Sequence, residues 1–110
     1  MKYNSHFWRN GTVMNVIENG SITLPRGFTA GAAAAGIKYE DRLDLAVLCS
    51  ERTAAVAGMF TRNAVKSAPV QLSSRRVTRG AARAIVANSG CANACTGARG
   101  LQDAERMTTL

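Results

Sequence analysis

The sequence predicts an α/β fold with helices and strands in layers, and two observations support this prediction. Short apolar runs typical of strands recur along the chain, the clearest at residues 43–49 and 83–87. Two helices are also indicated: Pro69 suits the start of the first, and the second is expected from Leu101 to the end of the sequence. Because helix, strand, glycine-rich loop and helix follow one another in the second half, we expect a layered α/β arrangement.

The first half of the chain is expected to be extended. Residues 12–17 alternate weakly between apolar and polar, and Gly20 lies in a turn at residues 18–21. Pro25 and Gly27 suit a turn or an edge position. The run TAGAAAAGIK at residues 29–38 would suit a helix by alanine propensity, but glycines interrupt it and it has no amphipathic stripe. We therefore expect extended backbone there.

The middle of the chain predicts a hairpin. Residues 43–49 (LDLAVLC) and 54–61 (AAVAGMFT) are two expected strands, joined by a turn at residues 51–53. Asp44, at the start of the first strand, is expected to face solvent. A loop at residues 63–68 then leads to a helix that starts at Pro69 and stops near Gly80, which suits the position after a helix end.

The loop NSGCANACTG, from Asn88 to Gly97, separates the expected strand at 83–87 from the last expected helix. Small, polar and glycine residues before a helix leave backbone N–H groups free, and the helix dipole favours negative charge there. Such a loop suits a phosphate, a carboxylate or a developing oxyanion. The alternative is a tight turn that only lets the helix pack close to the strand.

The net charge of +7, from 14 basic and 7 acidic residues, raises nucleic-acid binding as a hypothesis. The basic residues are scattered, however, and the densest group contains only Arg75, Arg76, Arg79 and Arg83. No aromatic residue lies among them to stack on bases. A solvated helix face is the interpretation that we prefer.

The three cysteines, Cys49, Cys91 and Cys95, are an odd number, and no secretory signal opens the chain. A reducing, cytoplasmic location is therefore expected. Together with His6, the three cysteines could supply the four ligands of a zinc site, but their spacing does not suit one. We therefore expect buried thiols and no metal. No apolar run approaches the about 20 residues that a membrane span needs.

The loop also carries a resemblance. The sequence NSGCANACTG followed by GLQDA resembles the ornithine acetyltransferase family, the bifunctional glutamate N-acetyltransferases of arginine biosynthesis. Further fragments occur in the family's order: PRGF at 25–28, AGIK at 35–38, DLA at 44–46, FTRN at 60–63 and APV at 68–70. The resemblance runs from about Gly20 to the end, which makes residues 1–19 an N-terminal extension and residues 20–110 the N-terminal part of a truncated α-chain domain.

The resemblance implies an activity and a site. Family members cleave themselves once into an α-chain and a β-chain, and the new N-terminal threonine of the β-chain takes acetyl from N-acetylornithine and passes it to glutamate. Some members also accept acetyl-CoA, no cofactor is needed, and the two chains assemble into heterotetramers or larger oligomers. The family's oxyanion hole corresponds to Thr96 and Gly97, where a hydroxyl and an unobstructed backbone N–H would stabilise the tetrahedral oxyanion.

The resemblance also implies what the sequence lacks. The nucleophile, the cleavage site and the remaining substrate-binding residues are expected beyond Leu110, and Thr108 and Thr109 follow the loop too closely to replace them. No C-terminal cap follows the last expected helix, so we expect the sequence to stop inside it and the chain alone to be inactive. The alternative is a small α/β anion-binding module without catalysis.

Overall fold

The computed structural model describes residues 8–9, 12–13 and 17–109. The order of elements is β1 (Trp8–Arg9), β2 (Thr12–Val13), β3 (Phe28–Ala33), β4 (Leu45–Ala55), α1 (Ala68–Val77), β5 (Ala81–Asn88) and α2 (Gly97–Arg106). β1 and β2 form a short antiparallel pair. The strand expected at residues 12–17 is thus confirmed only at Thr12 and Val13, and its residues 14–16 lie outside the described part.

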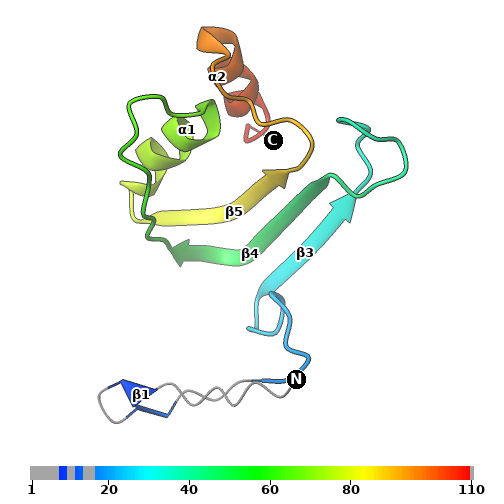
Figure 1. The fold of residues 1–110 in the computed structure, drawn as a ribbon. Helices are drawn as coiled ribbons and strands as arrows, with labels where there is room; N and C mark the ends of the chain where they lie inside the picture. Colours follow the sequence, from blue (N-terminus) through cyan, green and yellow to red (C-terminus); the bar gives the residue numbers. More distant parts are fainter. Residues whose placement is uncertain (1–7, 10–11, 14–16, 110) are drawn as a thin grey trace.

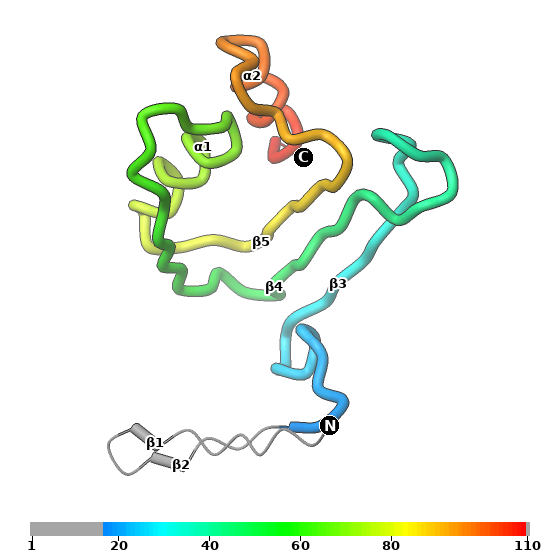
Figure 2. The backbone as a smooth tube through the Cα atoms, in the orientation of Figure 1, coloured from blue at the N-terminus to red at the C-terminus, as the bar shows by residue number. Residues whose placement is uncertain are grey.

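The centre of the fold is an antiparallel sheet in the order β3-β4-β5. Both helices lie next to β5 and away from β3, so the predicted layered arrangement of helices and strands is confirmed (Figure 1). The backbone trace shows the chain leaving β5 through a wide loop that leads into α2 (Figure 2). That loop is the one at residues 89–96. None of the helices in the described part of the chain has the length and apolar character needed to cross a membrane.

The predicted hairpin is wrong. Residues 45–55 form one continuous strand, β4, which pairs with β3 on one side and β5 on the other. The expected turn at residues 51–53 is instead an irregularity of the ladder between Cys49 and Ala54. Only Ala54 and Ala55 of the second expected strand belong to the sheet, and residues 56–61 have no regular structure.

Arg83 explains how the strand passes through this irregularity. It lies between the two β5 residues, Ala84 and Ala82, that pair with Cys49 and Ala54. Its guanidinium donates hydrogen bonds to the carbonyl oxygens of Ser50 (3.2 Å) and Glu51 (3.0 Å). Because backbone carbonyls that leave a ladder need other donors, the arginine replaces bonds that the bulge removes.

The extended backbone expected at residues 29–38 and the helix expected from Pro69 are largely confirmed. β3 covers Phe28–Ala33, although alanine and glycine are poor strand formers, because it pairs along its whole length with β4. α1 starts at Ala68 with Pro69 in its first turn, and its last residue is Val77. Gly80 follows with a left-handed backbone (φ +69°), as expected of a residue beyond a helix end.

The last helix differs from the prediction at both ends. α2 begins at Gly97, four positions before the expected Leu101, and ends at Arg106. The amide of Met107 donates to the carbonyl of Asp103, and a turn follows. The expectation that the sequence stops inside a helix is therefore wrong.

The core lies between the two helices. Ala68 and Leu72 of α1 pack against Ala104 of α2, with Leu101 at their edge. Several large apolar side chains are exposed elsewhere, among them Leu43, Met59, Val65 and Ile85. The small core and the large exposed apolar surface of the described residues fit an incomplete fold.

Candidate functional site

Hydrogen bonds to other parts of the chain hold the loop at residues 89–96 at its start and in its middle. The amide of Ser89 donates to the carbonyl of Asp44 at 2.8 Å, which ties the start of the loop to the start of β4. The amide of Ala68 donates to the carbonyl of Asn93 at 3.2 Å, which ties the middle of the loop to the start of α1. The side-chain amide of Asn88 donates to the carbonyl of Cys91 within the loop. The loop therefore has a defined shape.

Thr96 and Asn93 form the centre of the loop. The hydroxyl of Thr96 donates to the side-chain oxygen of Asn93 at 2.6 Å, and the side-chain nitrogen of Asn93 donates to the carbonyl of Gly100 at 2.8 Å. Gly100 is buried, and a Cβ atom there would collide with the Thr96 hydroxyl and the Asn93 side-chain oxygen. Only glycine at this position in α2 lets the helix approach the loop so closely.

Gly97 begins α2 with a left-handed backbone (φ +61°), and no atom of a more distant described residue lies within 4 Å of the place that its Cβ would occupy. No side chain in the described part of the chain caps this helix start. The first amides of a helix have no partner within the helix and attract negative charge. Thr96 and Gly97, the two residues for which the family resemblance implies an oxyanion hole, thus lie where a helix begins.

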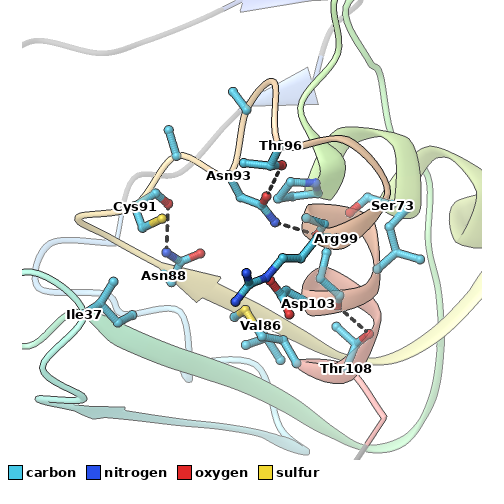
Figure 3. A pocket seen from close by; sticks show the side chains of 17 residues that line it. Ile37, Ser73, Val86, Asn88, Cys91, Asn93, Thr96, Arg99, Asp103 and Thr108 are labelled. Atoms are coloured by element: carbon cyan, nitrogen blue, oxygen red, sulfur yellow. Dashed lines mark hydrogen bonds between the residues drawn. The ribbon is translucent and has the colours of Figure 1, made fainter.

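The loop borders a pocket of about 730 Å³ between β5, α1 and α2. Figure 3 shows Thr96 and Asn93 at one end of this pocket and Ile37 and Val86 toward the sheet. Most of its lining is apolar, and Arg99 and Asp103 of α2 supply its charged groups. Asn93 and Thr96 make the end of the pocket at the loop polar, the helices add a few further polar groups, and apolar side chains line most of the rest, which is the usual build of a small-molecule site.

The expectation that Asp44 faces solvent is wrong, because only 7% of its surface is exposed. Its two carboxylate oxygens accept hydrogen bonds of 2.6 Å from the amides of Ala35 and Ile37. The hydrogen bond from the Ala35 amide, and after it the one from the Ile37 amide, contribute most to lowering the pKa of Asp44, because both bonds favour the charged carboxylate.

This arrangement makes stability depend on the charge of Asp44. A pKa that is lowered by folding adds stability above the pKa of the unfolded chain, and this stability is lost as the pH falls through the folded value. We expect Asp44→Asn to lower the melting temperature of the full-length protein at neutral pH and to flatten its dependence on pH in acid. Thermal melts across the acid range measure this effect, with the exposed Asp41→Asn as control. Equal acid dependence in Asp44→Asn and wild type would contradict it.

The other candidate residues have structural explanations. Arg75 forms an ion pair of 3.4 Å with Glu105, and Arg83 serves the β-bulge, so the basic group is partly engaged with the protein itself. The hydroxyls of Thr108 and Thr109 both donate to the carbonyl of Glu105 at the end of α2.

The expectation of buried thiols is wrong for Cys91 and Cys95, which are exposed, whereas Cys49 is half-buried. Small cysteine side chains were expected to pack inside, but Cys95 is exposed on the loop and the exposed Cys91 borders the pocket. The described residues contain no cluster of three or more histidine, cysteine or acidic side chains suited to a metal ion. His6, the fourth residue of the zinc hypothesis, lies outside the described residues.

The chain resembles known proteins over most of its length. Two curated relatives are each an "Arginine biosynthesis bifunctional protein ArgJ": that of Geobacter sulfurreducens is 54% identical over 77% of this chain, and that of Caldanaerobacter subterraneus is 52% identical over 83%. The matched stretch is 22% of each relative, so this chain spans about a fifth of their length.

Solved structures agree with these relatives. The crystal structure of the Bacillus halodurans arginine biosynthesis bifunctional protein ArgJ matches with a TM-score of 0.78 and 40% identity, over 83% of this chain and 48% of that one. Ornithine acetyltransferase from Mycobacterium tuberculosis, solved with ornithine, matches with a TM-score of 0.74 and 49% identity, over 77% of this chain and 45% of that one. The ArgJ family itself matches residues 29–110. The chain therefore belongs to the ArgJ family.

Proposed function

We propose that the full-length protein containing this chain transfers an acetyl group from N2-acetyl-L-ornithine to L-glutamate in arginine biosynthesis. Thr96 and Gly97 are the oxyanion hole of this reaction. The observation that carries the proposal is the placement of a hydroxyl and an uncapped helix start side by side at the polar end of a pocket, in a chain of the ArgJ family. The relative solved with ornithine supports the substrate class.

The chemistry explains why these two groups are needed. The hydroxyl of an N-terminal threonine in a second chain attacks the acetyl carbonyl, whose oxygen becomes an oxyanion in the tetrahedral intermediate. The Gly97 amide and the Thr96 hydroxyl donate hydrogen bonds to that oxygen as its charge develops. Ornithine then leaves as the amine and the acetyl group stays on the threonine as an ester. The amine of glutamate attacks this ester by the same kind of intermediate and takes the acetyl group away.

A two-chain enzyme is supported by the lengths of the relatives. Similar stretches of this chain match 22% of the curated proteins but 48% and 45% of the solved chains, so the solved chains are about half as long. This is the proportion expected if a precursor is cut once near its middle. We propose that the present chain is part of the first product and that its partner is the second, in a heterotetramer or larger assembly.

The remaining features of the proposal follow from this mechanism. The nucleophile and the other substrate-binding residues lie outside residues 1–110, so the 110-residue chain alone is inactive. No cofactor takes part, and acetyl-CoA is an alternative acetyl donor to glutamate. Such a reaction of amino-acid biosynthesis takes place in the cytoplasm.

The test is an acetyl-transfer assay on the full-length protein. With N2-acetyl-L-ornithine carrying a labelled acetyl group, we expect label to appear in N-acetylglutamate only when glutamate is present. Each turnover should release one ornithine. If no label is transferred, while inorganic phosphate or acetate raises the melting temperature, the site is an anion-binding module without catalysis and the proposal fails.

A further inference from the structure

We propose that Asn93 is a positioning residue that holds the hydroxyl of Thr96 ready for the oxyanion, an inference that rests on the proposed function. The side chain of Asn93 lies between two groups, the Thr96 hydroxyl at 2.6 Å and the Gly100 carbonyl at 2.8 Å. Both bonds are visible in Figure 3 at the polar end of the pocket. One asparagine side chain thereby links the oxyanion loop to the second turn of α2.

The Gly100 carbonyl decides which way the Asn93 amide faces. A backbone carbonyl only accepts hydrogen bonds, so the NH₂ group of Asn93 must point toward it. The oxygen of Asn93 must then face Thr96, and an amide oxygen also only accepts. The Thr96 hydroxyl is therefore the donor of the bond that joins the two side chains. Its single proton is directed at Asn93 in the resting site.

This proton becomes available only when a stronger acceptor arrives. A hydroxyl has one proton, so Thr96 cannot donate to Asn93 and to an oxyanion at once. The bond to Asn93 fixes the position of the Thr96 Oγ beforehand, so only the proton has to turn about the Cβ–Oγ bond toward the oxyanion, which is a better acceptor than a neutral amide. The bond to the oxyanion thus forms mainly in the transition state, and an interaction of this kind raises kcat rather than affinity.

Three structural features keep this arrangement in place. The Asn93 carbonyl accepts a hydrogen bond from the Ala68 amide at the start of α1. The Asn93 backbone is left-handed (φ +42°), a conformation that asparagine tolerates better than most residues. Gly100 leaves the space that both polar side chains occupy. The loop therefore holds Asn93, and Asn93 in turn fixes the rotamer of Thr96.

The main test is Asn93→Gly in the full-length protein, because glycine removes the amide and keeps the left-handed backbone. We expect kcat for acetyl transfer to fall by about 10- to 100-fold, the scale of a misplaced catalytic group, with KM within about twofold of wild type. The matched control is Asn19→Gly, since Asn19 is also left-handed (φ +63°) but lies in an exposed turn. The control should keep the wild-type kcat.

A double-variant cycle separates positioning from general stability. If Asn93 acts through Thr96, Asn93→Gly should lower kcat by less than about twofold when Thr96 is already alanine, because contacting groups are not additive. Equal losses in both backgrounds would overturn the inference and leave Asn93 a structural residue. A wild-type rate for Thr96→Ala would instead overturn the oxyanion hole itself.

A second variant, Asn93→Asp, keeps a residue that tolerates the left-handed backbone and an oxygen that accepts from Thr96. It loses the donor to the Gly100 carbonyl, and its carboxylate binds the Thr96 proton more strongly than the neutral amide does, in competition with the oxyanion. We expect a lower kcat at neutral pH with an unchanged KM, and a wild-type kcat for this variant would overturn the inference.

Discussion

Replacing Thr96 by alanine is expected to lower kcat of the full-length protein by about 10²- to 10³-fold, the usual cost of losing one oxyanion donor. The loss should fall on kcat, because the oxyanion exists only after attack on the acetyl carbonyl. Folding should be retained, since Thr96 is exposed and its side chain forms one hydrogen bond, to Asn93. Steady-state kinetics and a thermal melt of the same sample measure both effects.

The control for this prediction is Thr96→Ser, which keeps the hydroxyl and removes only the methyl group. It should recover most of the lost rate, because serine can donate to the same oxygen. A Thr96→Ala enzyme that turns over at the wild-type rate would contradict the assignment of Thr96 to the oxyanion hole.

Gly100→Ala is the second change with a large expected effect. In an ordinary helix interior, alanine is more favourable than glycine by about 0.8–1 kcal/mol. Here the added Cβ would collide with the Thr96 hydroxyl and the Asn93 side-chain oxygen. We expect a net loss of about 1–3 kcal/mol in the free energy of unfolding, the typical cost of overpacking, and a fall in kcat because both polar groups must move. Denaturant unfolding and steady-state kinetics test the two effects.

Gly80→Ala is a useful comparison, since no atom of the described residues beyond its two chain neighbours lies within 4 Å of its Cβ position, so its left-handed backbone is what opposes the change. That variant should lose some stability and keep its kcat. If Gly100→Ala were as stable and as active as wild type, the close approach of α2 to the loop would be refuted.

The sheet shows how far the sequence could predict the fold. The loop and helix around Pro69 and the strand near residues 83–87 were predictable, because proline and apolar runs act locally. The hairpin was not, because the polar residues 51–53 look like a turn but belong to an irregular part of β4, where the Glu51 carbonyl accepts a hydrogen bond from Arg83. That bond joins residues more than 30 positions apart, and no local pattern reveals it.

The position of the site could be predicted from the sequence, but the hydrogen bonds within it could not. The glycine-rich loop before a helix indicated an anion site, and the family resemblance pointed to Thr96 and Gly97. The start of α2 was missed although Thr96, a residue type that suits the N-cap, precedes it, because glycine at positions 97 and 100 argues against a helix and the Thr96 hydroxyl bonds to Asn93 instead of capping. The bonds of Asn93 and Asp44 depend on which backbone groups the fold brings near them, which composition and spacing do not encode.

The most direct test of the account is an intact-mass measurement on the full-length protein after mixing with N2-acetyl-L-ornithine without glutamate. The account predicts two chains: one that contains residues of this sequence, and one that begins with threonine and is heavier by one acetyl group. Adding glutamate should remove that acetyl group. A single uncut chain, or two chains of which neither gains an acetyl group, would contradict catalysis through an acetyl-threonyl enzyme.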